Sequence, residues 1–225
     1  MGTPILDESE LAKLKRIVEV YLIAKEMTLL GEAIDPEQRT QLEIFEGFRH
    51  AYDHLMRIFA YRFEIADISE ETEEKYTEAN ISSVHNHVIR AAYDAMDWVA
   101  VVIQERMARE LEGYSEQTIH TVLPQYYPVI KPRITKLTNE TFVGIRSKKD
   151  IGNDNTDNLI QYATLVRELK KYYYDTVNAK NALIEYEGKL RKTRRNEISW
   201  KIVGPIAGAI VGAILALIIT CARSG

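Results

Sequence analysis

The feature that most constrains this chain is a run of 20 residues without a charged side chain, Ile202–Cys221, close to the C-terminus. An α-helix rises 1.5 Å per residue, so this run extends about 30 Å, which matches the hydrocarbon core of a bilayer. A helix buried in a protein core normally keeps a polar stripe, and this run has none. The run therefore predicts a single transmembrane helix over residues 200–221.

The charges on either side of the run predict its orientation. Only Arg223 follows it, whereas six basic residues precede it: Lys189, Arg191, Lys192, Arg194, Arg195 and Lys201. Basic flanks stay on the cytoplasmic side of a membrane, and they attract anionic lipid headgroups. We therefore expect a single-pass protein of the cell inner membrane with a cytoplasmic N-terminal domain. Four residues follow Cys221, so we expect the helix to be a tail anchor.

Small residues recur inside the expected span at every fourth position: Gly204, Gly208, Gly212 and Ala216. Residues four apart lie on one face of a helix, and a face of small side chains lets two helices approach closely. Within lipid, this close packing replaces the hydrophobic drive for helix association. The spacing predicts a homo-oligomer that packs through the membrane helix.

The rest of the chain is predicted to be all-α. Charged residues make up 28% and hydrophobic residues 46% of the sequence, which is ordinary globular composition. The only cysteine, Cys221, excludes a disulfide framework and a thiolate metal site.

Apolar residues at spacings of three and four predict helices over 8–33, 36–65, 70–111 and 159–199. Prolines 124, 128 and 132 predict an irregular stretch between 113 and 158. We expect a helical bundle over 1–150, a loop and helical stalk over 151–199, and the transmembrane anchor over 200–221.

Two of these helices share a short motif. Residues 48–55 and 89–96 both carry Arg, Ala, Tyr and Asp at the same relative positions. The repetition indicates two facing helices of one bundle. The arginine and aspartate of each copy, Arg49–Asp53 and Arg90–Asp94, are four residues apart, so they could form ion pairs on the helix surface or pair across the interface between the helices.

Arg49, His50 and His54 form the motif that most suggests chemistry, an arginine followed five residues later by a histidine. In this respect residues 8–112 resemble the HEPN superfamily of helical-bundle proteins. Many of its members are RNases of toxin–antitoxin, CRISPR and abortive-infection systems. The resemblance implies a metal-independent site, without cofactor, that two chains build together. It also implies that His54 is the acid/base, that Arg49 binds the scissile phosphate and that His50 is an accessory polar residue.

Two other interpretations of these residues stay open. His50 and His54 are four apart, which is a metal-ligand spacing, and Asp53, Asp94, His85 or His87 could complete such a site. Alternatively, the arginines form ordinary ion pairs, and the histidines are half-buried residues with hydrogen-bond partners.

Two hypotheses of function follow. In the first, the chain is a membrane-anchored oligomeric protein of a bacterial defence system, of the abortive-infection or CRISPR-accessory type, that acts at the bilayer. In the second, it is a HEPN-like endoribonuclease or RNA-binding domain tethered to the membrane. The expected partners are the lipid bilayer, further copies of the chain, RNA under the second hypothesis, and a partner protein of the defence system.

Overall fold

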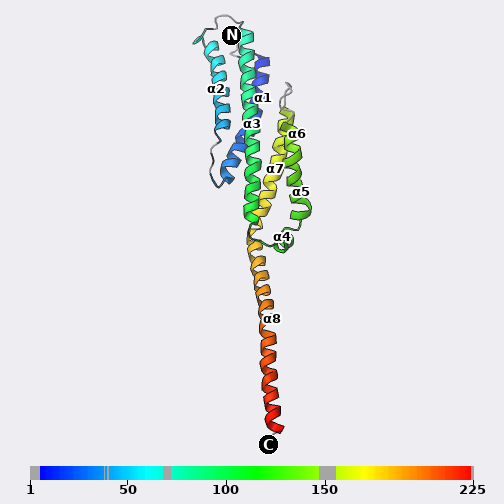
Figure 1. The fold of residues 1–225 in the computed structure, drawn as a ribbon. Helices are drawn as coiled ribbons and strands as arrows, with labels where there is room; N and C mark the ends of the chain where they lie inside the picture. The colour runs from blue at the N-terminus through cyan, green and yellow to red at the C-terminus, as the bar shows by residue number, and fades with distance from the viewer. Residues whose placement is uncertain (1–5, 38, 40, 68–71, 147–155, 224–225) are drawn as a thin grey trace.

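The computed structural model describes residues 6–37, 39, 41–67, 72–146 and 156–223, and their side chains as far as Gly212 with a few gaps. All regular structure in these residues is helical, and no strand occurs among them (Figure 1). The predicted all-α class is therefore confirmed.

The first three helices are α1 (Glu8–Ile34), α2 (Leu42–Arg62) and α3 (Glu73–Leu111). The start of α1 is fixed by a capping box, in which Asp7 and Glu10 each accept a hydrogen bond of 2.8 Å from the other's backbone N–H. The predicted start of the second helix at Pro36 is wrong. The buried carboxylate of Asp35 accepts hydrogen bonds from the backbone N–H groups of Glu37 and Arg39 and so holds a turn there.

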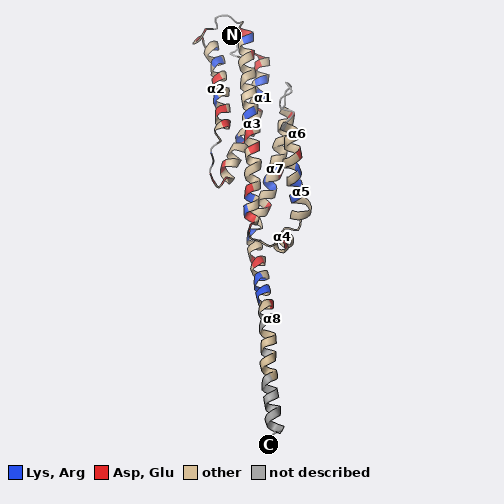
Figure 2. Cartoon of the chain, viewed as in Figure 1, with Lys and Arg blue, Asp and Glu red and all other residues tan. Residues whose placement is uncertain are grey.

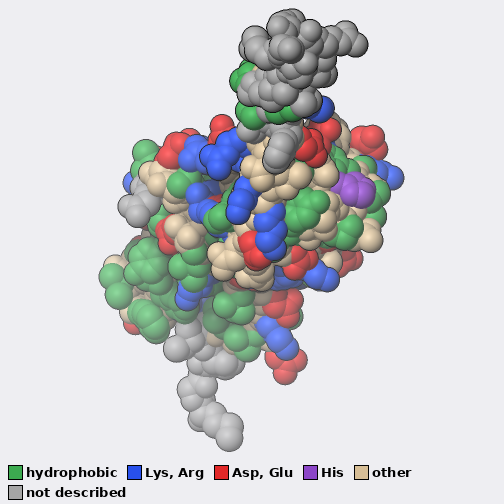
Figure 3. All heavy atoms as spheres, turned by 90° about the horizontal axis from the view of Figure 1, so that it is seen from below, with side chains coloured by type: hydrophobic (Ala, Val, Ile, Leu, Met, Phe, Trp, Pro, Cys, Tyr) green, Lys and Arg blue, Asp and Glu red, His purple; other side chains and the backbone are tan. Residues whose placement is uncertain are grey.

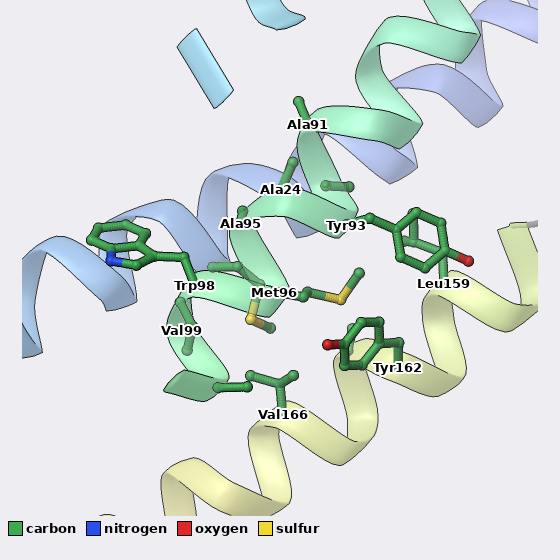
Figure 4. Packing of buried hydrophobic residues seen from close by; sticks show 14 of the residues in the cluster. Ala24, Ala91, Tyr93, Ala95, Met96, Trp98, Val99, Leu159, Tyr162 and Val166 are labelled. Carbon is green, nitrogen blue, oxygen red and sulfur yellow. The ribbon is translucent and has the colours of Figure 1, made fainter. Parts of the chain in front are cut away.

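The core is built around α3, against which α1, α2 and α7 (Thr156–Asn178) all pack. The close approach of α1 depends on Gly31, because a Cβ atom at this position would lie 2.4 Å from the ring of Trp98. On the other side, Leu159, Tyr162 and Val166 of α7 point toward α3 (Figure 4) and are fully buried. Residues 156–178, which we expected in a stalk, thus belong to the bundle, because their apolar stripe is covered by α3.

The stretch expected to be irregular is largely helical. It contains α4 (Glu116–Val122), α5 (Lys131–Lys136) and α6 (Phe142–Arg146), and π-helical turns, Tyr126–Ile130 and Leu137–Thr141, precede and follow α5. Pro128 lies within the first π-helical turn, where the N–H of Ile130 donates to the carbonyl of Gln125 five residues earlier. Pro132 lies in the first turn of α5, where a missing N–H costs little. Pro128 and Pro132 therefore shape this helical segment without ending it, whereas Pro124 lies in the turn that follows the end of α4. The predicted loop before Asp157 falls mainly in residues 147–155, outside the described residues.

The last helix, α8 (Lys180–Arg223), follows α7 after the single residue Ala179 and leaves the bundle (Figure 1). Its basic residues come just before an uncharged stretch (Figure 2). Over the described residues, none of the helices combines the length and the hydropathy that crossing a membrane requires. The predicted span is helical in its backbone, but the side chains of residues 213–221 lie outside the described part.

The first turns of α8 are held to the bundle by Glu187. Its buried carboxylate accepts hydrogen bonds from the backbone N–H of Ser115 (3.0 Å), from the Ser115 hydroxyl (2.9 Å) and from the Thr118 hydroxyl (2.6 Å). Arg191 donates to it as well, at 2.9 Å. These donors lower the pKa of Glu187 to about 2. Because Ser115 is the N-cap of α4, this carboxylate fixes α4 to α8.

Candidate functional site

The predicted site residues Arg49, His50 and His54 lie on α2, near a close approach of this helix to α3. The approach is possible because Gly47 has no side chain: a Cβ atom there would lie 3.0 Å from the Cβ of Ala91 and 3.3 Å from the carbonyl oxygen of His87. The contact at Gly47 therefore places the α2 motif beside His87.

Three histidines form a cluster across the two helices. The ring of His87 lies 5.1 Å from that of His50, centroid to centroid, and 5.5 Å from that of His54. The rings of His54 and His87 are stacked, with an angle of 20° between their planes. His50 is exposed, whereas His54 and His87 are half-buried. We refer to His50, His54 and His87 as the histidine cluster.

Asn80 of α3 orients His54. The side-chain amide of Asn80 donates to the carbonyl of Tyr76 at 2.9 Å, which leaves its Oδ1 to accept from Nδ1 of His54, also at 2.9 Å. Nδ1 then carries the proton, and Nε2 of neutral His54 keeps its lone pair. This is the form that a general base requires. Asn80 itself is buried, so this orientation is shielded from water.

Arg49 lies beside His50 and not beside His54. Its Nη2 is 3.1 Å from Nε2 of His50, and its side chain is exposed. Positions five apart on a helix point roughly 140° away from each other, which accounts for the separation of Arg49 from His54. Within one chain, Arg49 thus does not contact His54. The two residues are connected through the contacts of Arg49 with His50, of His50 with His87, and of His87 with His54.

Arg49 and Asp53, one of the two possible ion pairs of the motif, do not pair with each other. Asp53 pairs instead with Arg57, at 2.7 Å, and Arg49 takes His50 as its neighbour. The matching pair on α3 is present, although long: Nε of Arg90 lies 4.0 Å from the carboxylate of Asp94. Both aspartates considered as metal ligands are therefore engaged by arginines.

The charge state of the cluster depends on pH. Burial lowers the pKa of His87, and the positive charges of His50, His54 and Arg90 lower it further. At neutral pH, His87 is therefore uncharged and can accept a proton. In acid the cluster gains positive charge beside Arg49 and Arg90.

The geometry gives no support to the metal interpretation. Within the described ranges, no group of three or more His, Cys, Asp or Glu side chains is arranged to hold a metal ion. His87 joins the α2 histidines, as that interpretation allowed, but its ring stacks on His54 and is tilted against His50. His85 lies two positions from His87 and so projects from a different side of α3.

Sequence reasoning missed Asn80 as a member of the site. Asn80 and His87 are seven residues apart and share one face of α3, together with Val84 and Ala91. Once α2 is known to cover this face, a polar residue within an otherwise apolar stripe is a signal for a buried hydrogen bond.

Comparisons with protein-family models, with curated proteins and with solved structures returned no match for this chain.

Proposed function

We propose that this protein is a membrane-anchored helical protein that works as a homo-oligomer, with its bundle held in the cytoplasm by α8. The observation that carries the proposal is the apolar surface on the far part of α8. Val203, Ile206, Ile210 and Val211 are each more than half exposed, on a helix that has left the bundle. Such a surface is unfavourable in water and is stabilised when lipid or another apolar helix covers it.

The glycines of α8 support self-association. Gly204, Gly208 and Gly212 share one face, and a Cβ atom built on any of them has no neighbour within 4 Å. A second α8 could therefore approach this face closely, as small-residue interfaces of membrane helices do. The basic block that precedes the apolar stretch suits the cytoplasmic leaflet, where anionic lipids are found.

The anchor is tested by fractionation of cells that express the full chain. We expect the protein in the membrane pellet after washing with high salt and with alkaline carbonate, treatments that remove peripheral proteins. A variant that ends at residue 199 should move to the supernatant. Recovery of the full chain in the carbonate supernatant would refute the membrane anchor.

We further propose a role as a bacterial defence effector whose assembled spans act on the bilayer. This role is supported by the resemblance of the α2 motif to HEPN proteins of such systems and by the exposed glycine face. Expression of the wild type is expected to arrest growth. Gly208→Leu/Gly212→Leu should relieve the arrest, since bulky side chains block close helix packing, whereas Arg49→Ala/His54→Ala should not. The opposite pattern would overturn this role.

A HEPN-like ribonuclease is the second candidate, and one specific observation favours it. His54 is held by Asn80 with Nε2 available as a base, and Arg49 on the same helix presents an exposed guanidinium, which suits a phosphate. A second chain would have to bring its own Arg49 to His54, since the two do not meet within one chain. Purified protein should then cleave single-stranded RNA without metal, and both His54→Ala and Arg49→Ala should abolish cleavage. Equal cleavage by His54→Ala would exclude this candidate.

A further inference from the structure

Helix α1 is apolar on two opposite faces. One face lies in the core, through residues such as Val20, Ala24 and Met27, which are fully buried. The other face carries four large aliphatic side chains that are all more than half exposed: Leu11, Val18, Leu22 and Leu29. At 3.6 residues per turn, these four lie within about 20° of a single line along the helix. A surface helix normally presents polar residues on its outer face, so this stripe indicates a further partner.

Helix α2 carries a second stripe of the same kind. The exposed apolar side chains of α2 and of its C-cap residue lie on the side away from α3 and are Leu42, Phe45, Tyr52, Met56 and, at the C-cap, Phe63. We call the nine exposed side chains of the two stripes the α1/α2 face. In the view from below, hydrophobic side chains gather on the side of the molecule where α2 lies (Figure 3).

The two helices run antiparallel and side by side. Arg62, at the end of α2, pairs with Glu10, at the start of α1, at 2.6 Å. Midway along, the rings of Tyr21 and Phe48 are 5.5 Å apart. Each helix packs along α3, whereas the contact between α1 and α2 is slight. The outer side of the pair is therefore a long apolar surface formed by two helices, of the kind that a second helix pair can cover to complete a four-helix arrangement.

The size of the α1/α2 face suits a stable dimer. Its nine side chains are between 36% and 65% exposed. If each carries roughly 200 Å² in full, they offer roughly 950 Å², which is somewhat more than the roughly 800 Å² that one partner buries in a standard protein–protein interface. A patch of this size exceeds the largest apolar patch of a typical monomer, about 300–600 Å².

We propose that the α1/α2 face of one protomer packs on the same face of a second copy, about a two-fold axis parallel to α8. In this arrangement α1 of each protomer lies against α2 of its partner. The parallel orientation rests on the proposed membrane anchor, because two chains inserted in one bilayer must direct their α8 helices the same way. An antiparallel dimer would place α1 against α1 and send the two α8 helices in opposite directions.

The charges beside the stripes agree with the parallel arrangement. A two-fold axis along the helices keeps each residue at its own level. The Glu10–Arg62 and Tyr21–Phe48 contacts place Lys15 within about one turn of the level of Asp53, and both side chains are exposed. Lys15 borders the α1 stripe on the flank that meets the Asp53 flank of α2 in the partner. A lysine of α1 thus faces a carboxylate on α2 of the partner, and such complementary charges fix register and orientation.

The test uses the full chain purified in detergent, with the mass of the protein component measured by light scattering. Gly208→Leu/Gly212→Leu serves as the background, so that the membrane helices do not hold the dimer. In this background we expect a dimer. Adding Val18→Glu/Leu22→Glu should raise its dissociation constant about tenfold or more, since it places charges at the centre of the interface. Gln161→Glu/Thr164→Glu adds the same charge at exposed positions of α7 and should leave the dimer intact.

A charge exchange tests the orientation. Lys15→Asp should weaken the dimer, and adding Asp53→Lys should restore it, because only the parallel arrangement brings these two positions together. A monomer in the glycine background, or a dimer unaffected by Val18→Glu/Leu22→Glu, would overturn the inference. Failure of the exchange to restore the dimer would overturn the parallel orientation. None of these results affects the membrane anchor, which the carbonate wash tests separately.

Discussion

The imidazole of His87 on α3 stacks on that of His54 on α2, with the ring centroids 5.5 Å apart. The same ring also lies 5.1 Å from His50. A contact of this kind between two helices is stable only while the rings are mostly uncharged, since like charges at this distance repel. The interface between α2 and α3 is therefore sensitive to protonation.

The first prediction concerns acid stability. The pKa of His87 is lowered in the folded protein by burial and by the charges of His50, His54 and Arg90. The unfolded chain therefore binds a proton more readily, and stability falls as the pH drops below the ordinary histidine pKa of about 6.5. Thermal melts between pH 7.5 and pH 5.5 should show a falling Tm. His87→Gln should flatten this dependence, whereas His120→Gln, at an exposed position of α4, should not. Equal slopes for wild type and His87→Gln would contradict the prediction.

The second prediction concerns Asn80. Asn80→Ala removes the acceptor for Nδ1 of His54 and leaves this half-buried ring without its partner. We expect a loss of about 1–2 kcal/mol in the free energy of unfolding, measured by urea denaturation. In nitrogen-detected NMR spectra, His54 should also change from one tautomer to a mixture. Asn86→Ala, at an exposed position of the same helix, is the control and should change neither quantity.

A third prediction compares two glycines. Gly31→Ala places a methyl group against the ring of Trp98 and should destabilise the bundle by about 1–3 kcal/mol, because the ring is held between α1 and α3. Gly188→Ala meets no atom within 4 Å and lies inside α8. It should stabilise that helix by about 0.5–1 kcal/mol. Urea denaturation followed by circular dichroism measures both changes, and a neutral Gly31→Ala would show that α1 is not tightly packed there.

The fourth prediction concerns the attachment of α4 to α8. Glu187→Ala leaves the Ser115 N–H and the Thr118 hydroxyl without their acceptor, at a cost of about 2–3 kcal/mol. Hydrogen exchange of the α4 amides should accelerate strongly, while exchange in α3 should stay slow. Glu185→Ala, which removes an exposed carboxylate two positions earlier, should leave α4 protected. Unchanged exchange in α4 after Glu187→Ala would refute this attachment.

The Glu187 carboxylate also makes stability depend on pH, but for a different reason from His87. Hydrogen bonds to its charged form lower its pKa, whereas burial lowers the pKa of His87. The pKa of Glu187 is lowered from 4.5 to about 2 in the folded protein. Its contribution to stability is therefore complete above pH 4.5 and is lost as the pH falls from 4.5 toward 2. The protection of the α4 amides, measured against the intrinsic exchange rate at each pH, should fall over this range in wild type, whereas in Glu187→Ala it should already be low at neutral pH.

The two copies of the Arg, Ala, Tyr and Asp motif show what the sequence could predict and what it could not. The repetition indicated two helices that face each other, and α2 and α3 do pack together. Yet Tyr52 of the first copy is 63% exposed, and Tyr93 of the second is 1% exposed. The motif is the same, but α3 is surrounded by three helices and α2 borders only one side of it. Helical periodicity marks the apolar positions, whereas the number of neighbours depends on tertiary packing.

The expected break is present at Pro124, which follows the end of α4, whereas the structure differs from the predictions at Pro128, at Pro132 and in the stalk for related reasons. The prolines predicted a break, but a π-helical turn and a first helical turn accommodate Pro128 and Pro132 without one. The helix predicted over 159–199 does carry an apolar stripe, which includes Leu159, Tyr162 and Val166. Its partner, α3, lies more than 50 residues earlier in the chain, and no local pattern identifies a partner at that distance.

The junction between α7 and α8 has a mechanical consequence. Ala179 interrupts the helical assignment, but backbone hydrogen bonds continue across it, from Ala179 to Asp175 at 3.2 Å and from Leu183 to Ala179 at 2.9 Å. The core helix and the projecting helix therefore form one nearly continuous shaft. A tilt or rotation imposed at the far end of α8 would turn α7 against α3, and α3 carries His87. Rotation or tilt of the far part of α8 is therefore transmitted mechanically to the helical bundle.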